Sequence, residues 1–296
     1  MCWLRSSKGR GDGGDGDWET RLNSKDLEKN QPESTEHSAS PSPPVSPSPV
    51  TASPRPPVSP SALRVLLWDI DGTLIRSART GAFKDYTIPM LEGVFGTSGR
   101  LAEMQVSGMT DLQIVAEALR EEGFTQKHIL DRIDHLRERY MEEMKRVTSK
   151  GAEFFQLLPG VRETLEAIAA HPRYRSALLT GNIEPAAYLK MDLMELSAFF
   201  DLPGAFGDES HDRRDLPAFA AERIREHLGV DLEPHQFIVI GDTPNDIDCA
   251  RHFGARALAV GTGRLYQTRD LLDCKPDAFL PNLSDPDLVL QTLAKL

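Results

Sequence analysis

The chain has 296 residues, of which 40% are hydrophobic and 27% charged, a composition typical of soluble globular proteins. Its formal net charge of -11 offers no basic field to recruit a phosphate backbone, so we expect neither a nucleic-acid nor a membrane partner. The three cysteines are scattered. No run of residues reads as a membrane span or as the apolar part of a secretory signal. We therefore expect a reducing, cytoplasmic location.

Residues 1–62 differ in composition from the rest of the chain. Prolines interspersed with serines fill the stretch from Pro32 to Pro60. Such a segment buries too little apolar area to offset its ordering entropy, so we predict a disordered tail. An alternative is that the Pro–Ser repeats dock into an aromatic-lined groove of a partner.

From Ser61 onward, short apolar runs alternate with helical patterns. Each run is apolar on both faces and ends at a small or acidic residue, as buried parallel strands do. This alternation predicts an α/β fold, a Rossmann-like doubly wound parallel sheet whose site lies at the strand ends. The predicted strands are Val65–Trp68, Ala177–Leu179, Phe237–Ile240, Ala257–Val260 and Ala278–Leu280, and the helices between them include Val161–Ala170, Pro217–Leu228 and Asn245–Phe253.

One stretch, residues 81–155, interrupts the alternation with helical pattern only. Thr110 to Gln113 has the form of a capping box at a helix start. After Thr125, apolar residues recur at steps of three or four as far as Val147, which predicts one long amphipathic helix. We interpret the stretch as a helical domain inserted between two parts of the α/β core, residues 63–80 and 156–296.

The first chemically suggestive motif is Asp69-Ile70-Asp71-Gly72-Thr73, directly after the first predicted strand. Two carboxylates leaving one strand end can share a divalent cation, which lowers the pKa of a nucleophile and neutralises an incoming phosphate. The glycine permits a sharp turn. Taken alone, an Asp-Gly turn after a strand is common.

Two further motifs follow predicted strands. Thr180-Gly181-Asn182 offers a hydroxyl and backbone N–H groups to a phosphate oxygen, although such a loop is also an ordinary turn. In Gly241-Asp242-Thr243-Pro244-Asn245-Asp246, two aspartates four residues apart stand where a helix begins. Helix capping explains one of these acidic residues but not the repeated acidic strand ends.

Together the three motifs resemble those of the haloacid dehalogenase-like hydrolase superfamily, in its phosphatase branch of phosphoglycolate-phosphatase-like type, over residues 63–296. The resemblance implies a Mg2+-dependent reaction through an aspartyl-phosphate and identifies the inserted helices as a cap over the site. It implies that Asp69 is the nucleophile and Asp71 the general acid and base. The resemblance further implies a phosphate pocket of Thr180, Gly181 and Asn182, and metal ligands Asp69, Asp71, Asp242 and Asp246.

The family usually places a lysine between the second and third motifs. Here the stretch before the helix at 217 offers Arg213 and Arg214, and we favour Arg213 as the phosphate-binding cation; alternatively, both are solvated and the position is vacant. Lys190 stands close to Thr180 in an amphipathic pattern, so we expect it to be solvated. Lys84 is a weak candidate for a Schiff-base lysine, because no apolar pocket around it is visible in the sequence.

The resulting hypothesis is a phosphatase acting on a phosphate monoester of a small metabolite, phosphoglycolate-like or a sugar phosphate. The second aspartate of the first motif argues against halide removal. One alternative is a phosphosugar mutase of the same superfamily, which returns the phosphoryl group to its substrate. Another is a catalytically quiet interaction protein that works through its tail. Neither the substrate nor the oligomeric state follows from the sequence.

Overall fold

The structure is a computed structural model that describes residues 59–149 and 154–296. A disordered tail was predicted for residues 1–62, and residues 1–58 of it lie outside the described residues. Its last residues, Pro60–Ala62, form one short turn of 3-10 helix. The Pro60 carbonyl accepts a hydrogen bond from Gln236 Nε2 at 2.8 Å, so the ordered fold begins before Leu63.

A five-stranded parallel sheet forms the core, in the order β4-β1-β5-β6-β7. Each strand overlaps one of the predicted apolar runs, and its ends differ from the predicted ends by at most three residues. This agreement confirms the Rossmann-like doubly wound α/β fold. Parallel strands need long crossover connections, and helices supply them here. The strands are β1 (Arg64–Trp68), β4 (Tyr174–Leu178), β5 (Phe237–Gly241), β6 (Arg256–Val260) and β7 (Ala278–Leu280).

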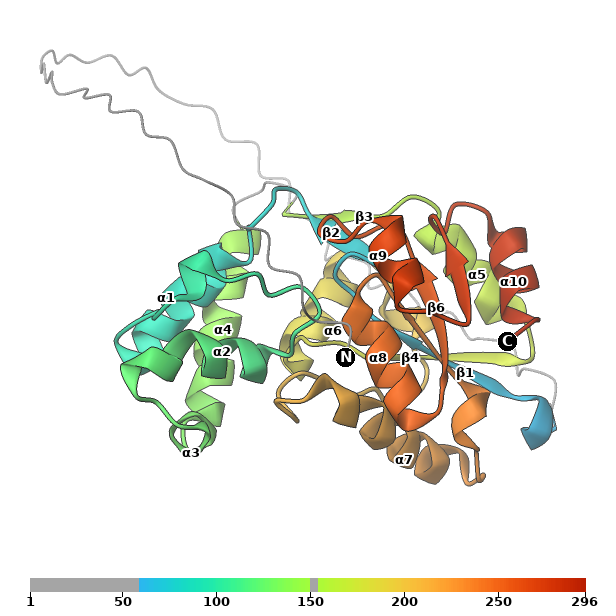
Figure 1. Cartoon of the computed structure of the whole chain (residues 1–296), viewed down its shortest axis with the longest axis horizontal. Coiled ribbons are helices and arrows are strands. Elements are labelled where there is room, and N and C mark those ends of the chain that lie inside the picture. The colour runs from blue at the N-terminus through green and yellow to red at the C-terminus, as the bar shows by residue number, and fades with distance from the viewer. Residues whose placement is uncertain (1–58, 150–153) are drawn as a thin grey trace, which may run out of the picture. The chain divides into compact units, whose positions relative to one another are not determined.

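Helices cover both faces of this sheet (Figure 1). Alternate residues of β1 point to opposite faces, as the two-residue period of a strand requires. Leu66 and Trp68 pack in the core cluster with α5, α6 and α10, and Val65 and Leu67 pack with α7, α8 and α9. These helices are α5 (Val161–Ala170), α6 (Glu184–Leu193), α7 (Leu216–Leu228), α8 (Pro244–Phe253), α9 (Thr268–Asp273) and α10 (Pro286–Leu293).

The stretch predicted as a helical insertion contains four helices among its described residues: α1 (Lys84–Phe95), α2 (Asp111–Leu119), α3 (Gln126–Leu130) and α4 (Ile133–Thr148). We call the described part of residues 81–155 the cap. At its two junctions with the core, β2 (Ile75–Ser77) pairs with β3 (Phe155–Leu157) in an antiparallel ribbon that the sequence did not predict. Three-residue strands are too short for a two-residue period to stand out in a sequence.

Two local predictions in the cap were wrong in detail. The long helix after Thr125 is divided into α3 and α4, because the backbone of Arg132 turns away from helical geometry (φ -117°, ψ 14°). Only half of the predicted capping box forms at Thr110, whose hydroxyl accepts the N–H of Gln113 at 3.1 Å. Within the described residues, no helix is both long and apolar enough to cross a membrane.

Leu67 lies in the middle of β1 and is fully buried, whereas Leu288 on α10 is 42% exposed. We expect Leu67→Ala to lower the free energy of unfolding by about 2–5 kcal/mol, through lost apolar burial and the cavity left behind. The matched change Leu288→Ala should cost less than about 1 kcal/mol. Urea unfolding followed by circular dichroism measures both values. Equal losses for the two variants would contradict the placement of β1 at the centre of the core.

Candidate active site

The three motifs meet at one edge of the sheet, because β4, β1 and β5 are neighbours in register. Trp68, the last residue of β1, pairs with Leu178 on one side and Ile240 on the other. The next backbone groups continue the ladder, with Asp69 donating its N–H to the Ile240 carbonyl at 3.0 Å. Asp69, Thr180 and Asp242 therefore leave the sheet side by side, as the parallel topology requires.

Gly72 allows the loop after β1 to close against the third motif. Its φ of +94° lies in the region that side chains disfavour, and a Cβ at this position would lie 2.4 Å from Asp242 Oδ2. The neighbouring Thr73 hydroxyl donates to Asp242 Oδ1 at 3.1 Å. This close approach fixes the carboxylate of Asp242 beside the loop that carries Asp69 and Asp71.

Asp69, Asp242 and Asp246 form a buried cluster whose oxygens lie within 4.8 Å of one another. Burial raises the pKa of Asp69 from 3.8 to about 7, although the Arg213 charge opposes the shift. Burial, followed by the charge of Asp69, raises the pKa of Asp242 well above its usual value. Excess negative charge packed this closely fits a divalent cation with oxygen ligands, such as Mg2+.

Arg213 supplies the positive charge within this cluster. Its Nη2 donates to Asp69 Oδ1 at 2.8 Å and to Asp246 Oδ1 at 2.5 Å. The side chain is 5% exposed, whereas that of Arg214 is 50% exposed and pairs with Asp212. The structure thus places Arg213, and not Arg214, beside Asp69, the nucleophile predicted from the sequence.

Lys190 is a site residue that the sequence interpretation missed, since we expected it to be solvated. Its side chain is 1% exposed, and Nζ donates to Asp71 Oδ2 and to Asn182 Oδ1, both at 2.6 Å. Burial alone lowers the pKa of Lys190, but the charge of Asp71 outweighs it and the pKa ends above its usual value. The signal was available: Lys190 is three and four residues from the buried Ala187 and Ala186 on one face of α6.

The loop after β4 is held by its own side chains. Thr180 is fully buried, and its Oγ1 accepts hydrogen bonds from Asn182 Nδ2 at 2.7 Å and from the Asn182 N–H at 3.3 Å. Asn182 Nδ2 also donates to Asp71 Oδ2 at 2.7 Å. This network joins the second motif to the first, so that the predicted phosphate-binding loop lies beside Asp71.

The cap closes over this loop through backbone and side-chain contacts. A Cβ on Gly181 would lie 2.0 Å from the Met109 carbonyl, so the cap and the core touch here. Asp111 at the start of α2 accepts the N–H of Ile183 at 2.8 Å, and burial raises its pKa to about 7. On the other side, Asn245 Nδ2 donates to the Gly108 carbonyl at 2.7 Å. These partners lie far apart in the chain, so no local pattern in the sequence predicts that they meet.

A pocket of about 370 Å³ lies between the cap and these loops. Its lining includes Asp69, Asp71 and Asp242 from the core together with Arg213 and Lys190. The cap contributes apolar side chains to the lining, and they include Phe83, Met104, Val106, Met109 and Ile114. The arrangement combines Asp69, the predicted nucleophile, with a second carboxylate and two cations in a small pocket, which suits chemistry on a compact anionic molecule.

A model of the family described as haloacid dehalogenase-like hydrolase matches residues 63–254 of this chain. In sequence, the chain is 28% identical over 202 residues to a phosphoglycolate phosphatase of Aquifex aeolicus, covering 67% of this chain and 85% of that protein. It is also 29% identical over 136 residues to a phosphoglycolate phosphatase of Nitrosospira multiformis, of which it spans 56%.

Among solved structures, a β-phosphoglucomutase of Clostridium difficile superposes with a TM-score of 0.57 at 13% identity, covering 79% of this chain and 98% of that one. A hydrolase of Pseudomonas syringae superposes with a TM-score of 0.56 at 20% identity, covering 79% and 99%. At these identities the likeness concerns the fold, and it includes the core and the cap helices.

Replacing Arg213 with Met should remove the cation between Asp69 and Asp246 and leave both carboxylates buried without it. Breaking a buried pair in this way costs about 3–5 kcal/mol of stability. Arg214→Met removes a solvated arginine and should change the free energy of unfolding by less than about 1 kcal/mol. Thermal and urea unfolding of the two variants measure this difference. Similar losses in both would contradict the assignment of Arg213 to the site.

The pKa of Asp69 predicts how stability and metal binding depend on pH. Folded Asp69 holds its proton up to about pH 7, whereas the unfolded carboxyl releases it near 3.8. Without metal, the stability contribution of this group is therefore present at low pH and is lost as pH rises through about 7. We expect magnesium to bind the ionised carboxylates, so its stabilising effect should grow through the same window.

The measurement is the rise in melting temperature on adding MgCl2, taken at about pH 6 and about pH 8. We expect the larger rise at the higher pH, and little rise at either pH for Asp242→Asn. A magnesium effect that is independent of pH, or one that persists in this variant, would argue against a metal held by the buried aspartates.

Proposed function

This chain is a phosphatase of the haloacid dehalogenase-like hydrolase family, and we propose that it hydrolyses phosphate monoesters of a small metabolite through a phosphoryl group carried on Asp69. The observation that supports this most directly is the convergence of Asp69 and Asp71 with two buried cations in the lining of one pocket. A protein that served only as a scaffold would have no need of this arrangement.

In the first step, a carboxylate oxygen of Asp69 attacks phosphorus and the bond from phosphorus to the alcohol oxygen breaks. Asp71 gives its proton to the departing alcohol. In the second step, water attacks the phosphorus of the aspartyl-phosphate while Asp71 takes its proton, and Asp69 leaves as a carboxylate. Atoms balance as monoester plus water giving alcohol plus inorganic phosphate.

The contacts of each aspartate suit its proposed role. Asp69 is buried and held by Arg213 at 2.8 Å, which fixes the direction of the attacking oxygen. The Asp71 side chain is 42% exposed, and Lys190 and Asn182 both bind its Oδ2. Within the described residues its Oδ1 accepts no hydrogen bond, so that oxygen is left to exchange a proton with the substrate or water.

The remaining residues would bind the phosphoryl group and the metal. Thr180, Gly181 and Asn182 line the pocket beside Asp71, where a hydroxyl and backbone N–H groups suit phosphate oxygens. Asp69, Asp242 and the main-chain carbonyl of Asp71 would hold the Mg2+ ion, with Asp246 in or beside its shell. The ion would supply charge neutralisation for the nucleophile and the incoming phosphate.

The size of the pocket limits the substrate. A volume of about 370 Å³ is near the lower end of ligand sites and accommodates a compact metabolite rather than a protein side chain presented on a folded surface. The named phosphoglycolate phosphatases among the relatives support a phosphate ester of this size. We therefore place phosphoglycolate and small sugar phosphates first among the substrates to examine.

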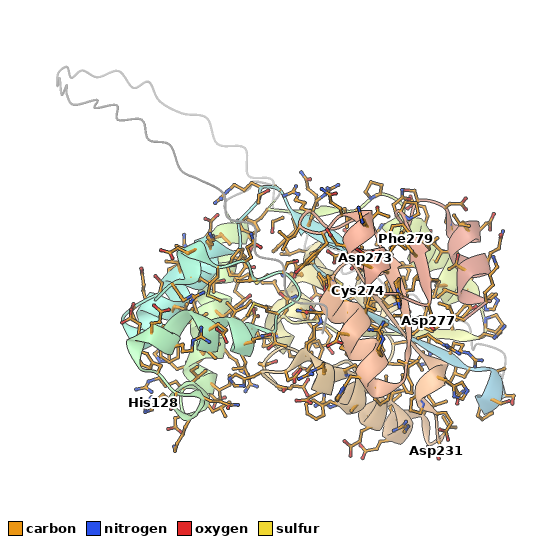
Figure 2. The ribbon with its side chains drawn as sticks, viewed as in Figure 1. His128, Asp231, Asp273, Cys274, Asp277 and Phe279 are labelled. Carbon is orange, nitrogen blue, oxygen red and sulfur yellow. The ribbon has the colours of Figure 1, made fainter. Side chains whose placement is uncertain are left out.

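The test is release of inorganic phosphate from a panel of such esters with MgCl2, using wild type, Asp69→Asn and Asp231→Asn. Asp69→Asn should lower kcat by at least about 10³-fold, because it removes the nucleophile while conserving shape. Asp231, whose side chain is 93% exposed beyond α7 (Figure 2), is the matched control and should retain full activity. Equal activity of all three proteins would sink the proposal.

The same assay separates hydrolysis from phosphoryl transfer back to a sugar. A phosphatase releases one phosphate for each ester consumed, whereas a mutase converts sugar phosphate with little phosphate released. Measuring ester loss and phosphate release together on a hexose monophosphate distinguishes the two outcomes. We expect a ratio of about one, as the balanced reaction requires.

A further inference from the structure

Two arginines line the pocket and have no role in the proposed chemistry. Arg76 belongs to β2, and Arg264 follows β6. Within residues 59–149 and 154–296, neither pairs with a carboxylate, although the chain as a whole carries 45 acidic against 34 basic side chains. Unpaired arginines are uncommon neighbours on the wall of one small pocket in so acidic a protein.

Both arginines are attached to the catalytic loops by short stretches of backbone. Arg76 follows Ile75, whose carbonyl accepts the Gly72 N–H at 2.7 Å. Arg264 follows Gly263, where a Cβ would lie 2.1 Å from Asp242 Oδ2. Thr262 completes the attachment, because its hydroxyl donates to the Gly72 carbonyl at 2.6 Å. Arg76 therefore starts from backbone held against Gly72 of the first motif, and Arg264 starts from backbone held against Gly72 and Asp242.

The two segments also approach each other. Arg264 Nη1 lies 3.5 Å from Thr80 Oγ1, and Thr80 lies on the pocket-lining segment that continues from Arg76. The loop after β6 and the loop after β2 thus border the same part of the pocket. A ligand group placed there would face cationic side chains from two directions.

The other cations of this region already have partners. Arg79 forms an ion pair with Asp85, and Lys84 Nζ donates to the Ala102 carbonyl. Lys190 and Arg213 are bound to the aspartates of the site. Within the described residues, this leaves Arg76 and Arg264 as the pocket arginines that pair with no carboxylate.

We propose that Arg76 and Arg264 form a second anion subsite, so that the substrate is a phosphate monoester that bears another negatively charged group. Guanidinium groups bind carboxylate and phosphate with paired, charge-assisted hydrogen bonds, and either group satisfies this chemistry. The subsite rests on the proposed phosphatase function. It adds that charge selectivity comes from core loops tied to the catalytic residues rather than from the cap.

The experiment compares esters that differ only in the second charge. Phosphoglycolate against ethyl phosphate tests a carboxylate, and propanediol bisphosphate against propyl phosphate tests a second phosphate. We expect wild type to prefer the member with the second anionic group in at least one pair, as measured by kcat/KM. Arg76→Gln and Arg264→Gln should each lower kcat/KM for that ester by about tenfold to a hundredfold, largely through KM, and should change kcat/KM for its simple alkyl phosphate partner by less than about threefold.

Arg269→Gln is the matched control, since Arg269 lies on α9 with its side chain 88% exposed and does not line the pocket. Equal losses on esters with and without the second anionic group would assign the arginines to stability instead and overturn the subsite. Full activity of both variants on every ester would overturn it as well. Absence of phosphate release by wild type from all four esters and from the wider panel would instead be a failure of the phosphatase proposal itself.

Discussion

The rest of the site depends on one electrostatic constraint, the packing of three buried carboxylates at the edge of a parallel sheet. Bringing Asp69, Asp242 and Asp246 within 4.8 Å of one another is unfavourable in a medium that solvates charge poorly. Burial raises the pKa of Asp69 to about 7, and the charge of Arg213 offsets only part of that rise. The site is therefore arranged for a further cation, and its ionisation is expected to follow metal binding.

Two cations divide the aspartates of the first motif between them. Arg213 binds Asp69 from the short turn before α7, and Lys190 binds Asp71 from the buried face of α6. An arginine reaches two carboxylates at once, and its Nη2 contacts both Asp69 and Asp246. A lysine is a compact point charge that fits between Asp71 and Asn182. Each residue type suits the number and spacing of the oxygens that it contacts.

Most of the core could be predicted because its strands are buried on both faces and end in polar motifs. That pattern located β1, β4 and β5 and brought Asp69, Thr180 and Asp242 to one edge. The prediction failed where a position depends on tertiary contacts. Lys190 looked solvated because most lysines are, and its burial requires Asp71 as a partner from 119 residues away.

The break between α3 and α4 and the β2–β3 ribbon were missed for related reasons. Apolar residues recur at helical spacing without interruption from Ile129 to Leu136, so this pattern does not predict the turn at Arg132. The ribbon joins residues about 80 positions apart, Ser77 with Phe155, and three-residue strands show no clear period. The sequence pattern predicts which face of a long helix or strand is buried, but it does not predict the short connections between these elements.

Asp246 illustrates how the fold uses one side chain to orient several others. Its Oδ1 accepts from Arg213, and its Oδ2 accepts both the N–H and the hydroxyl of Thr243 at the start of α8. With both oxygens engaged, Asp246 is better suited to hold Arg213 in place than to coordinate a metal directly. Asp242 accepts only the Thr73 hydroxyl among the described residues, so it has more capacity left for a metal ion. From the number of hydrogen bonds that each carboxylate already accepts, we infer different roles for the three aspartates. Asp69 and Asp242 would coordinate the metal, and Asp246 would position Arg213 beside it.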